Sequence, residues 1–372
     1  MPLRIGVNAL YLIPRGVGGT EIYLRNLLPA IARVDSEDDF FVFTNIETGP
    51  DLIPAASNFT YVPQPVRAVS RPRRLLWEQF QLPDEAGRLR LDCLFNPGFT
   101  APFSAPCPSV TVFHDLQHKR HPEHFRMLDL AGWRFFLYWS ARKSARLIAV
   151  SETTKKDLIR YYHRQPDRID VIGHGVEPAF LALPGRRAPE PFVLCVSTLH
   201  PHKGLDALLR AFVRFREERP GWRLVLAGMK GLHATDVEGL RLQLNLSDAI
   251  SITGWIAREE LIDLYRRAGI FVYPSTFEGF GMPVLEALAA GVPVACSNIE
   301  PLRSLAGDAA VQFEPNSEEA IARAMLEAER RSAELSEAGP RRAAGHTWEE
   351  AARLTVESLR AGSSCQSSRR DI

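Results

Sequence analysis

The chain has 372 residues, of which 45% are hydrophobic and 24% are charged. This length exceeds one ordinary hydrophobic core, so we expect two globular domains of roughly 150 to 200 residues each. The net charge of +1 provides no overall field that would favour nucleic acid as a partner. The five cysteines are scattered and form no C-x-x-C pair, which predicts a reduced, cytosolic protein without a structural zinc ion.

The first half of the chain alternates short β-branched or aromatic runs with longer amphipathic stretches. This alternation is typical of βα units that build a parallel sheet. Strands are expected at residues 4–7, 40–43, 60–62, 92–95, 110–113, 147–150 and 169–172. Helical patterns cover residues 21–33, 73–87 and 127–145. We therefore expect a doubly wound α/β domain.

The second half begins a new series of the same kind. Its strands are expected at residues 192–196, 223–226, 249–253, 270–273 and 292–296. Between the halves, residues 173–191 hold four prolines and three glycines, as an exposed linker does. The expected divisions are an acceptor-side domain at 1–175, a linker at 176–191, a nucleotide-sugar domain at 192–345, a C-terminal helix crossing back to the first domain at 346–362 and a disordered tail at 363–372.

The stretch from residue 271 to residue 291 combines a strand, a glycine-containing loop and a helix start. The strand ends near Tyr273, Pro283 suits the first turn of a helix, and Gly291 ends that helix. In open α/β sheets, ligands bind beyond the carboxyl ends of the strands, and a helix start offers free N–H groups to phosphate. The loop is therefore predicted to bind a diphosphate.

Two glutamates, Glu278 and Glu286, stand eight positions apart in this stretch. A carboxylate beside a diphosphate would be repelled, whereas an ionised acceptor forms a strong hydrogen bond with a neutral hydroxyl. Both glutamates are therefore expected to bind hydroxyl groups, which a nucleotide sugar carries at both of its ends.

The block from Glu278 to Glu286 resembles the E-x7-E motif of retaining glycosyltransferases with the GT-B fold, particularly family 4. Further ordered matches are Gly16 to Thr20, His114-Asp115, Val150-Ser151-Glu152, His174-Gly175-Val176, Thr198 to Gly204 and Ile252 to Trp255. The resemblance implies two Rossmann-like doubly wound domains that face each other across a cleft. It also implies that the chain transfers a sugar from a nucleotide diphosphate donor.

By this resemblance, Glu278 contacts hydroxyls of the transferred sugar and Glu286 contacts the ribose. Backbone amides at 279–281 would face the sugar, amides at 282–284 the phosphates, and residues 253–256 the base. The donor-binding residues implied are Gly18, Gly19, Thr198, Lys203, Gly254, Trp255, Glu278, Gly279, Phe280, Gly281, Met282, Pro283, Val284 and Glu286. The catalytic residues implied are His114, Lys203 and Glu278.

Lys203 follows a predicted strand and would supply a positive charge to the diphosphate. Many relatives carry an arginine in a G-R pair after that strand, but this chain has Ser197-Thr198 there, so the second cation is not identified. A lysine in this position can also be merely solvated.

His114 closes the predicted strand at 109–113, and the resemblance puts it beside the transferred sugar, where it would orient hydroxyls and meet an oxocarbenium-like transition state. The alternative is a buried histidine that caps the strand. Asp115 would either fix the tautomer of the ring or cap the following turn. The loop from Gly16 to Thr20 would close over the donor and help form the acceptor pocket.

The sequence contains no D-x-D, so we expect no catalytic metal and no cofactor. The resemblance favours GDP-mannose as donor, and a glycan or lipid-linked acceptor in cell-surface polysaccharide synthesis. Two alternatives stay open: a nucleotide-sugar epimerase on the same fold, and a non-catalytic subunit that binds a nucleotide sugar.

The N-terminus lacks the order of a signal peptide, and no stretch approaches the ~18 to 20 apolar residues that span a bilayer. We expect a cytoplasmic protein. Basic and aromatic residues interleave at 71–77 and 120–145, a pattern suited to an anionic membrane surface on the inner face. The alternative is that these aromatic residues pack inside the first domain.

Overall fold

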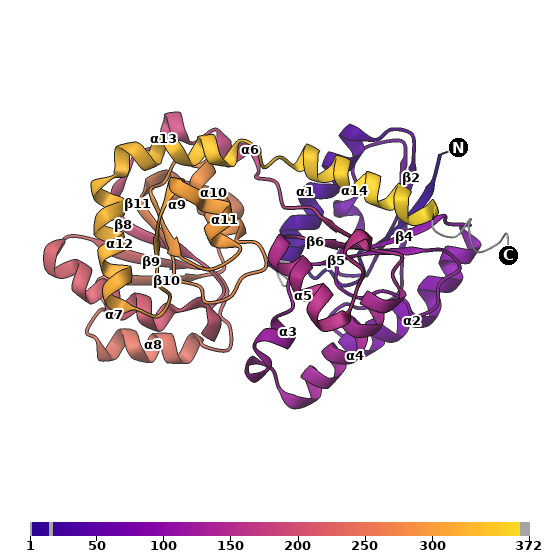
Figure 1. The fold of residues 1–372 in the computed structure, drawn as a ribbon, viewed down its shortest axis with the longest axis horizontal. Helices are drawn as coiled ribbons and strands as arrows, with labels where there is room; N and C mark the ends of the chain where they lie inside the picture. The colour runs from indigo at the N-terminus through magenta and orange to yellow at the C-terminus, as the bar shows by residue number, and fades with distance from the viewer. Residues whose placement is uncertain (1, 15–17, 365–372) are drawn as a thin grey trace. The chain divides into compact units, whose positions relative to one another are not determined.

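The computed structural model describes residues 2–14 and 18–364, and the chain divides into two α/β units (Figure 1). Unit 1 comprises Met1–Gly175 and Thr347–Ile372, and unit 2 comprises Val176–His346. Each unit contains one parallel sheet with its own helices, as the doubly wound pattern predicted.

The sheet of unit 1 has seven strands in the order β3-β2-β1-β4-β5-β6-β7, all parallel. Its strands are β1 (Arg4–Asn8), β2 (Asp39–Thr44), β3 (Phe59–Pro63), β4 (Cys93–Asn96), β5 (Ser109–Phe113), β6 (Arg146–Ala149) and β7 (Ile169–Val171). The strand order reverses between β1 and β4, and such a switch point opens a crevice for ligands.

The helices of unit 1 connect and cover these strands. They are α1 (Gly19–Val34), η1 (Gly49–Leu52), α2 (Arg71–Arg88), α3 (Gln117–Arg120), η2 (Pro122–His124), α4 (Met127–Lys143), α5 (Glu152–Tyr162), η3 (Pro166–Arg168) and α14 (Trp348–Ser363). Every residue of β5 is buried, because a parallel strand is covered by helices on both faces. Ser151 caps α5 by accepting a hydrogen bond from the amide of Thr154.

The sheet of unit 2 has six parallel strands in the order β10-β9-β8-β11-β12-β13. Its strands are β8 (Glu190–Val196), β9 (Arg223–Ala227), β10 (Ile250–Gly254), β11 (Ala268–Tyr273), β12 (Val294–Ser297) and β13 (Ala310–Phe313). Its helices are α6 (Pro178–Leu181), η4 (Pro184–Arg186), η5 (Pro201–Lys203), α7 (Leu205–Glu218), α8 (Ala234–Gln243), α9 (Arg258–Arg267), α10 (Met282–Ala289), α11 (Leu302–Ala306), η6 (Gly307–Ala309), α12 (Glu318–Arg330) and α13 (Ser332–Ala343).

The expected divisions of the chain differ from this structure in one segment. Residues 176–191, expected as an exposed linker, belong to unit 2 and contain α6, η4 and the start of β8. Phe180 on α6 is fully buried because it packs edge to face against Tyr265 on α9. A segment rich in proline and glycine can therefore still contribute to a core.

The C-terminal helix, expected at 346–362, is α14 and belongs to unit 1, where it lies along α1 (Figure 1). Gly362 lets α14 approach the sheet, since a Cβ there would stand 2.6 Å from a methyl carbon of Val110. In the tail expected at 363–372, Ser363 ends α14, and residues 365–372 lie outside the described residues.

Candidate functional site

In unit 2, the candidate donor-binding residues gather at the switch point between β8 and β11. The loops that follow these strands are joined by backbone contacts: the amide of Thr276 donates to the carbonyl of His202 at 2.7 Å. Gly204 has a φ of 65° and lies so close to the second loop that a Cβ would stand 2.2 Å from the carbonyl oxygen of Pro274. Only glycine suits both conditions.

This junction brings Lys203 and Glu278 together. The Nζ atom of Lys203 lies 2.6 Å from Oε1 of Glu278 and 3.2 Å from the hydroxyl oxygen of Tyr273. Only 14% of the lysine side chain and 11% of the glutamate side chain are exposed. The alternative of a merely solvated lysine is therefore wrong. The sequence did not indicate that these two residues bind each other.

Helix α10 begins directly after this loop. Its N-cap is Gly281, which has a φ of 103°, and a Cβ there would lie 2.3 Å from a methyl carbon of Leu302. The helix has neither a side-chain cap nor an acidic residue in its first turn. No negative side chain of the first turn therefore competes with an anion at the positive N-terminal end of the α10 dipole. The predicted contact of amides 282–284 with the phosphates requires this.

Glu286 lies on α10 and is 4% exposed. Its carboxylate contacts the guanidinium of Arg258 at 2.6 Å and accepts a hydrogen bond from Tyr265 at 3.1 Å. Burial raises the pKa of Glu286, while the positive charge of Arg258 opposes the rise. Arg258 also pairs with Glu177, so the predicted ribose ligand is held in a partly buried cluster of three charged groups.

The sequence reasoning missed Arg258 and Tyr265. Arg258 is the first residue of α9, and no motif singled it out. Burial disfavours the charged guanidinium, but Glu286 and Glu177 outweigh that effect and raise the pKa of Arg258. A basic residue at the N-terminus of a helix interacts unfavourably with the helix dipole. This unusual position was the signal in the sequence that Arg258 has an acidic partner elsewhere in the fold.

Thr198 and Trp255 lie beyond the carboxyl ends of β8 and β10, and Gly254 is the last residue of β10. The carbonyl of Gly254 accepts a hydrogen bond from the amide of Gly228, and a Cβ on Gly228 would stand 2.2 Å from the carbonyl oxygen of Ser197. The loops after three neighbouring strands are thus packed together. Trp255 is 49% exposed, and its predicted contact with a base stays a prediction.

In unit 1, His114 follows β5 and is 8% exposed. Its Nε2 atom lies 2.9 Å from the carbonyl oxygen of Pro97. A carbonyl oxygen can only accept, so Nε2 must carry the proton, which leaves Nδ1 as an acceptor in the neutral ring. Burial lowers the pKa of His114 to about 4, so the ring is neutral at pH 7.

Asp115 caps the turn that follows, by accepting from the amide of Gln117 at 2.9 Å. The Pro97 carbonyl therefore explains the tautomer of His114. His114 also belongs to an aromatic cluster: its ring centroid lies 4.9 Å from that of Tyr23 and 5.7 Å from that of His174. His174 stacks against Trp348, the first residue of α14.

The predicted glycine loop is only partly described. Gly18 has a φ of 61° and is the N-cap of α1, and Gly19 is the first residue of that helix. Residues 16 and 17, which belong to the same predicted loop, lie outside the described residues.

The sequence also did not predict the ion pair between Arg74 and Glu78 on α2. Glu78 is fully buried and lies 3.7 Å from Arg74, and its other carboxylate oxygen accepts from Thr100 at 2.8 Å. Burial raises the pKa of Glu78. The signal was a glutamate at helical spacing with Leu82 and Ala86, which are both buried.

The predicted basic and aromatic stretch on α4 has two kinds of aromatic residue. Trp133 and Phe136 pack against the core of unit 1, as the packing alternative predicted. Large apolar side chains of the same helix are exposed, namely Met127 at 85%, Leu128 at 90%, Phe135 at 51%, Tyr138 at 39% and Trp139 at 37%.

Two further properties bear on ligands and membranes. Within residues 2–14 and 18–364, one group has metal-ligand side chains close together: His121, Glu123 and His124, whose ligand atoms lie within 4.8 Å of one another. In the same part of the chain, no helix is long and apolar enough to cross a membrane.

Two family models match the chain in succession. The model described as Glycosyltransferase Family 4 matches residues 17–180, and the model described as Glycosyl transferases group 1 matches residues 182–343. The first match falls almost wholly in unit 1 and the second lies within unit 2.

Curated relatives include two O-antigen chain mannosyltransferases. The chain is 30% identical to O-antigen chain mannosyltransferase B of Escherichia coli over 59% of this chain and 60% of that protein. It is 26% identical to O-antigen chain mannosyltransferase RfbU of Salmonella typhimurium over 56% of this chain and 57% of that protein. The match thus spans less than two thirds of these relatives.

Solved structures share the fold over nearly the whole chain. Sucrose-phosphate synthase from Thermosynechococcus elongatus superposes with a TM-score of 0.78 at 20% identity, covering 96% of this chain and 98% of that one. The glycosyltransferase WaaG of lipopolysaccharide biosynthesis gives a TM-score of 0.71 at 16% identity, covering 95% and 99%. These likenesses confirm the expected GT-B fold.

Proposed function

Because this chain belongs to the glycosyltransferases of group 1 and family 4, we propose that it transfers a hexose from a nucleotide diphosphate sugar to a glycan or lipid-linked acceptor. The reaction retains the anomeric configuration and serves cell-surface polysaccharide synthesis. The observation that carries this proposal is the group of Lys203, Glu278 and the uncapped start of α10 at the switch point of unit 2.

The donor diphosphate lies at the N-terminus of α10 and beside Lys203. An ammonium group has three N–H donors, and two of them point to Glu278 and Tyr273. The third donates to a phosphate oxygen, so Lys203 stabilises the leaving diphosphate without losing its contact with Glu278. The helix dipole adds a favourable interaction of about 0.3 to 1 kcal/mol.

Glu278 accepts hydrogen bonds from hydroxyls of the transferred sugar, and its pairing with Lys203 holds the carboxylate in one orientation. Glu286 orients the ribose from its cluster with Arg258. In unit 1, His114 presents the Nδ1 acceptor of a neutral ring, which binds a hydroxyl without placing a positive charge near an oxocarbenium-like centre.

We propose GDP-mannose as the donor. The support is that several relatives are mannosyltransferases, among them the serotype-specific mannosyltransferase WbdA of Escherichia coli, which is 27% identical over 68% of this chain. The reaction needs no divalent metal in this proposal, because Lys203 and the start of α10 provide the positive potential that a metal supplies in other transferases.

The protein works in the cytoplasm, at the inner face of the membrane. The exposed apolar side chains of α4 support this placement, and four exposed basic residues accompany them: Arg126, Arg134, Arg142 and Lys143. Apolar side chains that enter the interface and cations that meet anionic headgroups together form a peripheral binding surface. A lipid-linked acceptor would be reached from that surface.

A transfer assay over a panel of UDP-, GDP- and ADP-sugars tests the proposal. Turnover with one donor class, in EDTA as well as in magnesium, and an unchanged anomeric configuration in the product are the expected results. Lack of both transfer and donor hydrolysis over the panel would contradict the enzymatic role, and a product of inverted configuration would contradict retention.

A further inference from the structure

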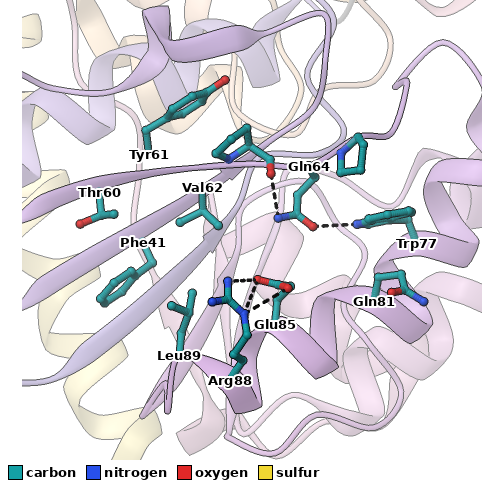
Figure 2. A pocket seen from close by; sticks show the side chains of 12 residues that line it. Phe41, Thr60, Tyr61, Val62, Gln64, Trp77, Gln81, Glu85, Arg88 and Leu89 are labelled. Atoms are coloured by element: carbon teal, nitrogen blue, oxygen red, sulfur yellow. Dashed lines mark hydrogen bonds and ion pairs between the residues drawn. The ribbon is translucent and has the colours of Figure 1, made fainter.

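Unit 1 contains a hollow on the outer side of its sheet, between the edge strand β3 and helix α2 (Figure 2). It has a volume of about 590 Å³. Such a volume falls within the range of small-ligand sites. Tyr61 and Val62 come from the strand, and Trp77, Gln81 and Glu85 come from the helix.

A second hollow of about 440 Å³ continues this one toward the start of α2. The two share the lining residues Pro65, Trp77 and Gln81, so they form one groove. The lining residues of α2 recur at helical spacing from Arg73 to Arg88 and thus lie on one face of the helix. At 1.5 Å per residue, this face is roughly 20 to 25 Å long.

The centre of the groove is an oriented tryptophan. The indole Nε1 of Trp77 donates to the side-chain oxygen of Gln64 at 2.9 Å, and the amide nitrogen of Gln64 donates to the carbonyl of Pro63 at 3.2 Å (Figure 2). Gln64 is buried, which holds the ring in place before any ligand arrives. One further aromatic side chain is exposed along the groove, Phe80 at 64%, whereas the side chain of Tyr61 points to the opposite face of the sheet from Trp77 (Figure 2).

Polar groups surround these rings. Arg88 forms a bidentate pair with Glu85, in which Nη2 lies 2.6 Å from Oε2 (Figure 2). Gln81 is exposed and carries both donor and acceptor atoms. Flat apolar faces beside planar hydrogen-bonding groups match a sugar ring, which has apolar C–H faces and a rim of hydroxyls.

The groove starts at the edge of the sheet where ligands of unit 1 are expected. The second hollow is lined by Arg67 and Ser70, which belong to the connection after the carboxyl end of β3. The first hollow reaches the C-terminal end of α2 at Arg88 and Leu89. A chain molecule bound at the carboxyl edge of the sheet can therefore continue along α2.

We propose that this groove is an accessory binding site for a neutral oligosaccharide, namely the part of a glycan acceptor that lies beyond the sugars at the reaction centre. The proposal rests on the proposed function for the identity of its ligand. Trp77 and Phe80 contact the faces of the sugar rings, and Gln81 with the Glu85–Arg88 pair binds hydroxyls.

Two other occupants fit the groove less well. A peptide that adds a strand to β3 needs N–H donors along the free edge, and Pro63 and Pro65 lack them at the end of that strand. A lipid chain would remove the Glu85–Arg88 pair and Gln81 from water without replacing their hydrogen bonds.

Calorimetry with mannose oligosaccharides, from the disaccharide to the hexasaccharide, tests the groove on the whole chain without donor. Affinity should rise with length, because the groove spans several sugar rings. Gln81→Ala and Phe80→Ala, both at exposed positions that line the groove, should each weaken hexasaccharide binding by roughly three- to tenfold. Trp77→Leu should weaken it further, and its thermal melting shows whether the unit still folds.

Gln243→Ala is the matched control, since it removes an exposed glutamine at the end of α8 in unit 2. Its affinity should equal that of the wild type. Wild-type affinity in all three groove variants would overturn the proposal, as would a wild type that binds no oligosaccharide but binds GDP or UDP. If the wild type bound neither oligosaccharide nor nucleotide and transferred no sugar, the proposed function would fail with it. Binding of a lipid or peptide, with no response to sugar, would also overturn it.

Discussion

Lys203 and Glu278 stand 75 residues apart in the sequence, yet Nζ of the lysine lies 2.6 Å from Oε1 of the glutamate. The pair joins the loop after β8 to the loop after β11, and both side chains are mostly buried. In the proposed reaction, the lysine meets the diphosphate and the glutamate meets the sugar. Loss of either side chain therefore also disturbs the other.

Glu278→Ala is expected to abolish transfer and leave the fold intact, because the side chain is proposed to bind a substrate hydroxyl rather than to fill a core. Turnover and thermal melting are the measurements. Retention of more than about a tenth of wild-type turnover, a loss below ~1.4 kcal/mol, would show that the role is wrongly assigned. Glu319→Ala, an exposed glutamate on α12 of the same unit, should keep full turnover.

Lys203→Ala should weaken binding of GDP or UDP by roughly ten- to a hundredfold, the effect of a charged hydrogen bond of about 1.5 to 3 kcal/mol. Calorimetric titrations with EDTA and with magnesium separate the lysine from a metal. Lys156→Ala, an exposed lysine on α5, is the control. Unchanged affinity in the Lys203 variant would place the phosphates elsewhere, and strict dependence on magnesium would contradict metal independence.

Arg258→Ala should destabilise the protein by about 3 kcal/mol, because it leaves Glu286 and Glu177 without their positive partner. Burial raises the pKa of Glu286 above its unfolded value, so the stabilising effect of protonation is present at low pH and is lost as pH rises. The variant should therefore be less destabilised at pH 5 than at pH 8.

Urea unfolding of this variant at both pH values measures the difference. Arg266→Ala on the same helix removes a surface pair with Asp263 and should cost only about 0 to 1 kcal/mol. If the Arg258 and Arg266 variants lost equal amounts of unfolding free energy, the cluster of Arg258, Glu286 and Glu177 would contribute no more to stability than a surface ion pair.

His114 should make unit 1 less stable in acid. Its pKa falls from 6.5 in the unfolded chain to about 4 in the folded protein because of burial. The contribution of His114 to the free energy of unfolding is therefore fully present above about pH 6.5 and is lost as pH falls toward 4. Between pH 7.5 and pH 5 the free energy of unfolding should fall by about 2 kcal/mol for this reason.

His114→Gln removes this contribution, so urea unfolding of the variant should show a smaller difference between those two pH values than the wild type shows. His118 and His174 also have lowered pKa values and retain their share of the effect. The control is His163→Asn, at an exposed position after α5. An undiminished difference in the His114 variant would contradict the prediction.

Leu128→Asp should reduce binding to anionic liposomes, because the side chain is 90% exposed on α4 and the substitution replaces an apolar group by a negative charge. Flotation at low and high salt is the measurement. Leu232→Asp, at a position 68% exposed in unit 2, is the matched control. If the wild type did not float with the liposomes at either salt concentration, the proposal that α4 binds the membrane would be contradicted.

The sequence predicted the strands well where they are buried on both faces, since runs such as β5 are apolar throughout. It missed β13, where only the end residues Ala310 and Phe313 are buried and Gln312 interrupts the run. It also mistook residues 176–191 for a linker, because proline content reports local conformation and says nothing of the distant Tyr265 against which Phe180 packs.

In the candidate site, the motif indicated Glu278, Glu286 and Lys203 but not their partners. The partners come from other strands and helices: Tyr273 and Arg258 contact these residues only after the sheet has formed. Spacing along a chain carries no information about such contacts. The proton on Nε2 of His114 likewise depends on Pro97, 17 residues away.

Helix α14 has a consequence for the order in which the protein is made. Unit 2 is one continuous stretch, whereas unit 1 is completed by residues after Thr347, including Trp348, which packs against Tyr23 and His174. A ribosome therefore releases all of unit 2 before the last helix of unit 1 emerges. Unit 2 can close its core during synthesis, while the aromatic cluster around His114 has to wait until α14 has emerged.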